Sequence, residues 1–166
     1  ALDNFEIDKV STATYYKEEN RGSFAIDATK KEQRDELASA FTIFNGTTGY
    51  YSGVLNTIAE NDGESTYEIN VNKEKFKTVK NPQVPESFKH VSLDLGKLYL
   101  KANDTIKISS KALSNGMIPE GSEAAWSRGR WTSLNLTPVI FDVKEELKEV
   151  TAFEEMDGLL AVEGEA

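Results

Sequence analysis

Short alternations of apolar and polar residues recur along the chain, separated by Gly, Asn, Asp and Pro. Period-two patterning turns one face of a segment toward a core and the other toward water, which is typical of β-strands. Segments with this pattern, or apolar runs of strand length, are found at residues 24–28, 38–44, 50–59, 67–72, 91–95, 105–109 and 133–137. No long helical pattern separates them. The sequence therefore predicts an all-β fold, a two-sheet antiparallel β-sandwich.

Three connections have a distinct local signal. Residues 45–49, Asn-Gly-Thr-Thr-Gly, have the composition of a hairpin loop, so we expect the flanking strands to pair directly. The charged segment 30–37 predicts one helical turn or a solvated strand entry. In the polar cluster 60–67 we expect a tight turn in which Gly63, after Asp62, supplies a positive φ.

Composition and charge exclude several classes of protein. The chain has 166 residues with 39% hydrophobic residues, enough for one core, and no apolar run long enough to span a membrane. Nineteen Lys and Arg against 28 Asp and Glu give a net charge of −9, which disfavours non-specific binding to nucleic acid or anionic membranes. There is no Cys and one His, so disulfides, thiolate chemistry and most transition-metal catalysis are excluded.

The composition changes after Pro138. Residues 142–155 are rich in acids and predict a solvated helix or linker, and residues 156–162 turn apolar again like an opening strand. We therefore expect a β-sandwich domain over residues 1–141. Residues 142–166 would be an acidic linker and the start of a following, truncated module.

A Gly-, Ser- and Arg-rich stretch contains the most unusual aromatic residue, Trp126. An indole face stacks on the apolar face of a pyranose, and the planar guanidinium groups of Arg128 and Arg130 can donate several hydrogen bonds to sugar oxygens. These residues are candidate ligand-binding residues. The alternative is that Trp126 caps one end of the core and the arginines pair with acidic loops.

Trp131 is a further candidate. If Leu134 and Leu136 face the core, strict alternation turns Trp131 outward, where its ring could contact a ligand. A bulge at Gly129 would reverse this orientation and make Trp131 a core residue.

The cluster at residues 60–67 supplies polar candidates. Asn61, Asp62 and Glu64 lie in an expected loop, where binding residues of a rigid sandwich commonly occur. Their oxygens could accept hydrogen bonds from sugar hydroxyls or bind calcium. Glu60 or Glu64 could also act as the acid or base of a small polysaccharide-active enzyme, which is kept as an alternative.

Several segments resemble carbohydrate-binding modules with the galactose-binding-like jelly roll, of which families six and thirty-five are examples. The resemblance spans roughly residues 38–138. The segments that carry it are 60–72 with the preceding strand 51–59, Gly96 with Asp104-Thr105-Ile106-Lys107-Ile108, Asn115–Gly121, and Arg128-Gly129-Arg130-Trp131.

The resemblance implies a jelly-roll sandwich and adds Asn115 to the candidate ligand-binding residues. It also implies a structural calcium ion, because such modules open with a Glu-x-Glu pair that helps to hold Ca²⁺. Here the corresponding segment is Phe5-Glu6-Ile7-Asp8, so Glu6 and Asp8 are the expected metal ligands.

The resulting hypothesis is a non-catalytic carbohydrate-binding module from a secreted or cell-surface bacterial protein. Its partners would be a polysaccharide, an appended glycoside hydrolase or lyase, and a neighbouring binding module. The charge of −9 favours a neutral polymer, such as an agarose-type galactan or a β-glucan, over a polyanion. The alternatives are an adhesion or structural sandwich that binds proteins, and the small enzyme described above.

Overall fold

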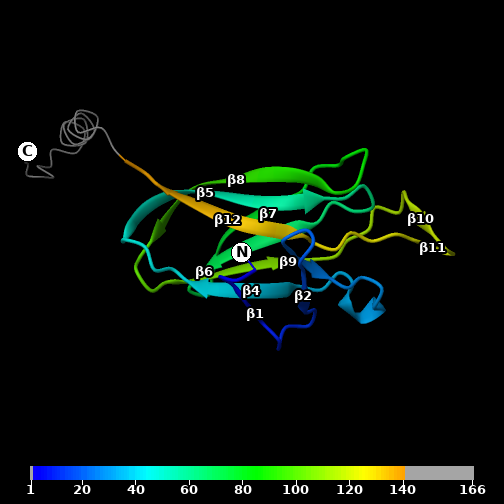
Figure 1. Ribbon diagram of the computed structural model, residues 1–166, viewed down its shortest axis with the longest axis horizontal. Coiled ribbons are helices and arrows are strands. Elements are labelled where there is room, and N and C mark those ends of the chain that lie inside the picture. The colour runs from blue at the N-terminus through cyan, green and yellow to red at the C-terminus, as the bar shows by residue number, and fades with distance from the viewer. Residues whose placement is uncertain (1, 141–166) are drawn as a thin grey trace, which may run out of the picture.

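The computed structural model describes residues 2–140 and shows two five-stranded sheets packed face to face (Figure 1). One sheet has the strand order β1-β4-β9-β6-β7 and the other the order β2-β3-β12-β5-β8. The strands and the 3₁₀ helix are β1 Glu6–Ile7, β2 Tyr15–Glu18, β3 Ser23–Ile26, η1 Lys31–Gln33, β4 Ala38–Ile43, β5 Gly49–Ala59, β6 Thr66–Val71, β7 Glu74–Lys80, β8 Lys89–Leu100, β9 Thr105–Ser110, β10 Pro119–Glu120, β11 Glu123–Ala124 and β12 Trp131–Pro138.

The predicted all-β, two-sheet antiparallel sandwich is confirmed, because neighbouring strands in both sheets pair antiparallel. The helical turn expected in the charged segment is η1. The described residues contain no helix with the length and apolar character needed to cross a membrane. The predicted acidic linker and truncated module, residues 142–166, lie outside the described residues.

The expected hairpin between β4 and β5 is wrong. β4 lies in one sheet and β5 in the other, so residues 44–48 carry the chain across the core from layer to layer. Phe44 packs its ring on Tyr51 with centroids 5.0 Å apart, and Tyr51 Oη donates a hydrogen bond to the Thr47 carbonyl. The glycines and asparagine thus predict a tight connection here, but they do not predict which sheet the next strand joins.

Of the two orientations considered for Trp131, the inward one, with an irregularity near Gly129, is confirmed, and the outward one is wrong. Trp131 is fully buried, its ring centroid lies 5.0 Å from that of Phe5 and 5.1 Å from that of Phe24, and its Nε1 donates to Tyr15 Oη at 3.1 Å. The register of β12 shifts directly after Trp131, and Gly129 has a φ of +59°. This irregularity turns the indole into the core, so Trp131 cannot contact a ligand at the surface.

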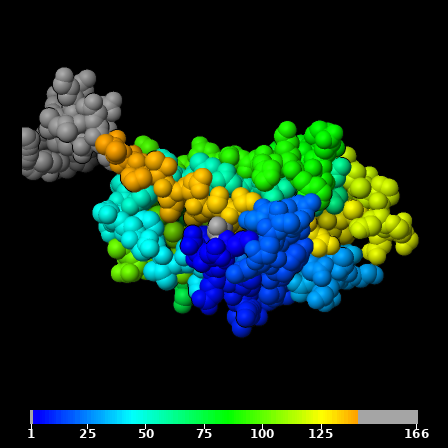
Figure 2. Space-filling model, in the orientation of Figure 1, coloured from blue at the N-terminus to red at the C-terminus, as the bar shows by residue number. Residues whose placement is uncertain are grey.

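The connections that follow β3, β5, β7 and β9 meet at one end of the sandwich, on the right in Figure 1. Figure 2 shows the β10–β11 hairpin projecting beyond the sheets at this end. β12 runs from this end toward the opposite one. The rigid sheets therefore present four loops at one place, which is the arrangement in which binding residues are commonly found.

Candidate functional site

The four loops enclose a cleft of about 460 Å³. Four of the ligand-binding candidates predicted from the sequence line it: Asp62, Trp126, Arg128 and Arg130. The full lining is Ala28, Thr29, Arg34, Glu60, Asp62, Phe88, Glu120, Glu123, Ala124, Trp126, Arg128 and Arg130. The structure thus brings together side chains that are far apart in the sequence.

A buried ionic network forms the floor of the cleft. Arg130 is 5% exposed, and its Nε and Nη2 donate to Glu18 Oε1 and Oε2 at 2.7 and 3.1 Å. Its Nη1 lies 2.7 Å from Oε1 of Glu60, which is itself only 6% exposed. Nε and Nη2 are thereby hydrogen-bonded to Glu18, while Nη1 is in ion-pair contact with Glu60 but makes no hydrogen bond among the described residues. Arg130 is enclosed by the two acids and therefore positions the floor of the cleft.

The network also sets the protonation of its acids. Burial raises the pKa of Glu60 above its ordinary value, although the Arg130 charge and the Arg128 amide oppose this shift. Burial acts in the same direction on Glu18, but the hydrogen bonds and charge of Arg130 outweigh it and hold the pKa of Glu18 below its usual range. The pKa of the Arg130 guanidinium is raised by the two acids against the effect of burial, so Arg130 stays charged.

Arg128 is placed differently from Arg130. Its backbone N–H donates to Glu60 Oε2 at 2.8 Å, while its Nη1 donates to Tyr16 Oη at 2.7 Å and lies 3.9 Å from Asp27. The side chain remains 28% exposed. Arg128 therefore keeps donor capacity that can reach a ligand in the cleft.

Trp126 is half-buried in the cleft wall and has a neighbour that the sequence did not reveal. The Arg34 guanidinium carbon lies 5.3 Å from the centroid of the indole. Arg34 is held there by a 2.7 Å hydrogen bond from its Nε to the Ala28 carbonyl and a 3.2 Å contact of its Nη1 with Glu123. A cation over the ring fixes the indole, so the two residues form one wall of the cleft.

Asp62 contributes an oxygen without a partner. Its Oδ1 is buried and makes no hydrogen bond among the described residues. Burial raises the pKa of Asp62, nearby Glu120 adds to this effect, and the charges of Arg130 and Arg128 oppose it. Buried polar atoms without partners are rare and costly, so this oxygen is a ready acceptor for a hydroxyl donated by a ligand.

The other three polar candidates lie beside the cleft and not in its lining. Asn115 Nδ2 donates to the Asn61 carbonyl and to Glu64 Oε2, both at 2.9 Å. Ser87 Oγ donates to Asn61 Oδ1 at 2.8 Å. These bonds join three loops, so the geometry gives Asn61, Glu64 and Asn115 the role of positioning residues behind the cleft.

Gly63 shows why the turn at residues 60–65 has its shape. Its φ is not positive, contrary to our expectation. A Cβ at Gly63 would instead lie 1.9 Å from the Leu113 carbonyl oxygen. The glycine is needed for the close approach of two backbones, supported by the hydrogen bond from the Asn115 N–H to the Asp62 carbonyl at 2.9 Å.

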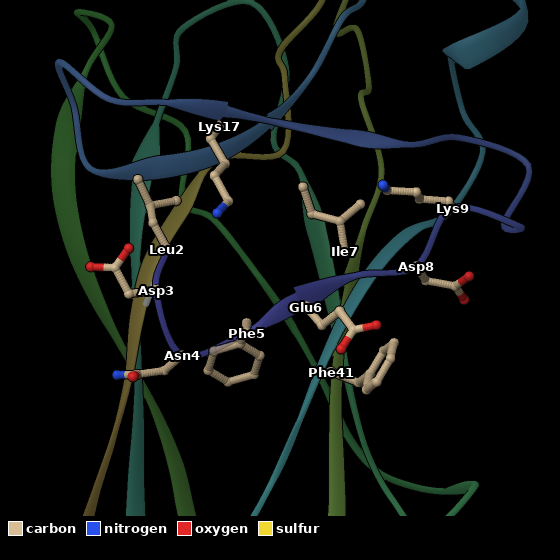
Figure 3. Close-up of a pocket in the computed structure, with 10 residues that line it drawn as sticks. All are labelled: Leu2, Asp3, Asn4, Phe5, Glu6, Ile7, Asp8, Lys9, Lys17 and Phe41. Atoms are coloured by element: carbon tan, nitrogen blue, oxygen red, sulfur yellow. The ribbon is translucent and has the colours of Figure 1, made fainter.

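The expected calcium ligands lie elsewhere, along the β1 edge. Glu6 is the cross-strand neighbour of Phe41, and both line a pocket of about 820 Å³ with Asp8 and Lys9 (Figure 3). Asp8 Oδ1 accepts a hydrogen bond from the Val10 N–H at 3.0 Å. Within residues 2–140, no group of three or more His, Cys, Asp or Glu side chains is placed to hold a metal ion. Calcium binding by Glu6 and Asp8 stays a prediction.

Four charged or aromatic lining residues were not among the sequence candidates: Arg34, Phe88, Glu120 and Glu123. Phe88 has a φ of +65°, and the Arg21 guanidinium lies 3.9 Å from its ring centroid. Glu120 and Glu123 belong to the β10–β11 hairpin. Glu120 lies within the segment Asn115–Gly121 that carries part of the resemblance, and Glu123 follows it by two residues. Only this position in the sequence could have pointed to the two acids.

Known proteins are similar to this chain in part of its sequence and in its fold. No family model matches the sequence. An uncharacterized protein, P23, from Formosa agariphila is 28% identical over 105 residues, which are 61% of this chain and 24% of that protein. The chain thus spans about a quarter of the length of this curated relative.

The solved structures that the fold is similar to include a family 35 carbohydrate-binding module from Clostridium thermocellum, with 11% identity over 82% of this chain and 89% of that one, at a TM-score of 0.47. An exo-β-1,3-galactanase from Phanerochaete chrysosporium has 11% identity over 81% and 27% of the two chains, at a TM-score of 0.49. A GH26-CBM35 β-(1,4)-mannanase from Podospora anserina has 14% identity over 84% and 29%, at a TM-score of 0.48. These similarities concern the fold alone.

Proposed function

We propose that the loop-end cleft binds a saccharide. A single feature carries the proposal: Trp126, the exposed part of Arg128 and the unpartnered Asp62 Oδ1 all line one cleft. A sugar ring has an apolar face that packs on an indole, and hydroxyl groups that both donate and accept hydrogen bonds. The cleft supplies the aromatic surface, a donor and an acceptor for these groups.

We further propose that the chain is a non-catalytic module that holds an appended glycoside hydrolase or lyase near its polysaccharide, in a secreted or cell-surface protein. The state of Glu60 supports a binding role. One of its oxygens pairs with Arg130 and the other accepts the Arg128 N–H, so neither is free to serve as a catalytic base. Adhesion through protein partners and catalysis by the cleft acids are the competing functions.

The charges of the cleft favour a neutral glycan. They come from three arginines and four acids: Arg34, Arg128, Arg130, Glu60, Asp62, Glu120 and Glu123. The cations are already paired with acids, so a carboxylate or sulfate entering the cleft would meet no excess of positive charge. Neutral galactans of the agarose type and β-glucans are therefore the first polymers to test.

Affinity electrophoresis of the full chain in gels containing single polysaccharides tests the proposal. We expect retardation by at least one neutral polymer with a Kd in the micromolar to millimolar range, because an open cleft offers few contacts against the cost of ordering the ligand. Trp126→Ala should weaken binding by about tenfold or more, and Arg128→Ala by a smaller factor. Tyr50→Ala, which removes a ring that is 51% exposed on β5, is the matched control and should bind like the parent.

Two outcomes would contradict the proposal. If Trp126→Ala and Arg128→Ala both retain the affinity of the parent, saccharide binding does not occur in this cleft. If the isolated chain releases reducing ends from the polymer, and Glu60→Gln abolishes the release, the chain is an enzyme and not a binding module.

A further inference from the structure

Most of the net negative charge of the chain comes from residues 142–166. Residues 142–166 contain nine of the 28 acids and two of the 19 basic residues. Residues 2–140 therefore have a net charge of about −2, not −9. A nearly neutral domain does not repel polyanions as a whole, so the local arrangement of its cations decides where an anion can bind.

One pocket on the sandwich is cationic. It has a volume of about 380 Å³ and is lined by Phe41, Asn72, Lys73, Thr105 and Lys107, with no acidic side chain. It lies where β4 ends and β9 begins, at the end of the molecule opposite the cleft (Figure 1). Among the described residues, neither lysine has an acid within salt-bridge distance.

The backbone fixes the position of Lys73. Asn72 and Lys73 form the turn between β6 and β7 with φ values of +51° and +73°. The Asn72 side chain is locked by hydrogen bonds to Asp104 at 2.7 Å and from the Thr105 N–H at 2.9 Å. A left-handed conformation is costly for lysine, and glycine is the usual residue at the second position of such a turn. Strained backbone of this kind is common at functional positions.

The sheet register places an aromatic ring beside Lys107, the second cation of the pocket. Phe41 on β4 lies directly opposite Lys107 on β9, and Lys107 in turn lies opposite Asn70 on β6. Asn70 Oδ1 is buried and makes no hydrogen bond among the described residues. An unpartnered acceptor therefore lies on the strand next to Lys107.

We propose that this pocket is a second saccharide site, specific for a sugar that carries a carboxylate or a sulfate group. The sugar ring packs on Phe41, and its anionic group lies between Lys73 and Lys107. The inference rests on the proposed function, that the protein binds polysaccharide. It differs from that function in location and in ligand, because the cleft favours neutral residues. A polymer with both kinds of residue could occupy both sites.

A pocket lined by one aromatic ring and two lysines favours a sugar over an acidic peptide. The pocket has two cations and one ring, which suits one monosaccharide with one charged group. An extended acidic peptide gains little from a ring and needs a longer row of cations. Polyglutamate is therefore the probe that separates recognition of a sugar from attraction to charge.

Affinity electrophoresis of the full chain at low ionic strength tests the inference. The gels contain agarose, polygalacturonate, carrageenan or polyglutamate. We expect the double variant Lys73→Ser/Lys107→Ser to bind polygalacturonate or carrageenan about tenfold more weakly than the parent, since each exposed ionic contact is worth a few-fold. Its binding to agarose should not change. The matched control Lys80→Ser/Lys89→Ser removes the same charge from exposed positions near the cleft end of β7 and β8, and should bind like the parent.

Phe41→Ala separates stacking from charge, and should weaken binding of the anionic polysaccharides while thermal melting shows that the variant is folded. Polygalacturonate and carrageenan distinguish a carboxylate from a sulfate ligand. The inference would be overturned if the two lysine double variants lost the same affinity for the anionic polysaccharides. It would also be overturned if polyglutamate bound as strongly as these polysaccharides, or if neither polygalacturonate nor carrageenan bound at all. Trp126→Ala distinguishes the two proposals, because it should weaken binding of neutral polymers and leave binding of anionic polysaccharides unchanged.

Discussion

Replacing Arg130 by methionine should destabilise the protein strongly, because it leaves a carboxylate buried without its counter-ion. Glu60 is 6% exposed and has Arg130 Nη1 at 2.7 Å from its Oε1. In Arg130→Met the Arg128 N–H remains as a partner of Glu60. A single backbone donor does not compensate for the lost charge. Breaking a buried ion pair by removing one partner costs about 3–5 kcal/mol, which corresponds to a fall in Tm of roughly 10–20 °C for a domain of this size.

The loss of stability in Arg130→Met should depend on pH in a defined direction. Burial already raises the pKa of Glu60 in the native protein, and removal of the guanidinium raises this pKa further. A carboxyl group whose pKa is higher in the folded than in the unfolded state binds more protons when folded, so stability falls as pH rises between the two values. The deficit of Arg130→Met relative to the parent should therefore be largest at neutral pH and shrink on acidification.

Thermal melting and urea unfolding of the parent, Arg130→Met, Glu60→Gln and the double variant measure this effect. We expect Glu60→Gln alone to cost about 1–2 kcal/mol, since Arg130 keeps both contacts with Glu18. The double variant should be more stable than Arg130→Met alone, because no buried charge remains without a partner. A Tm of Arg130→Met within 2–3 °C of the parent would refute the reasoning, as would a double variant whose loss is the sum of the single losses.

Three further predictions concern the loop turn, the acceptor in the cleft and the metal. Gly63→Ala should lower stability by about 1–3 kcal/mol in urea unfolding, because its Cβ would meet the Leu113 carbonyl; an unchanged midpoint would contradict this close approach. Saccharide affinity measured against pH should fall on acidification with a midpoint above the ordinary pKa of aspartate, since burial raises the pKa of Asp62 and its ionised form accepts the hydroxyl. Asp62→Asn should remove this pH dependence. Calcium at 100 times its Kd should stabilise the fold by about 2.7 kcal/mol, with the gain lost on chelation and in Glu6→Gln/Asp8→Asn; an equal Tm in all cases would exclude the site.

The strands were predictable where one face of a segment is buried and the other is wet. β6 shows this well, because Tyr67 and Ile69 are buried while Glu68 and Asn70 are not. Sheet membership was not predictable, because β4 and β5 present the same kind of pattern whether they pair or face each other across the core. The orientation of Trp131 could not be decided from the sequence for a related reason: one irregularity in the register reverses every later position.

In the candidate site, the sequence predicted residues that lie close together in one loop, but not contacts between residues far apart in the chain. Trp126 and Arg128 lie two residues apart in a Gly-, Ser- and Arg-rich stretch, so the sequence alone indicated that they could bind a ligand. Arg34 contacts Glu123 across 89 residues, and Arg130 contacts Glu18 across 112 residues. Such pairs follow from the strand order of the two sheets, and the local sequence does not predict them.

Arg128 and Arg130 show how far identical side chains two residues apart can diverge in role. Both contact Glu60, one through its backbone N–H and the other through its guanidinium, so one carboxylate holds the chain on either side of Gly129. The guanidinium of Arg130 is buried between Glu18 and Glu60 at the floor, and that of Arg128 remains partly exposed. If this division is correct, Arg130→Met impairs stability first and Arg128→Ala impairs binding with little change in Tm. If both substitutions instead lower stability and binding in parallel, Glu60 and the two arginines act as one unit, and the cleft exists only while that unit is intact.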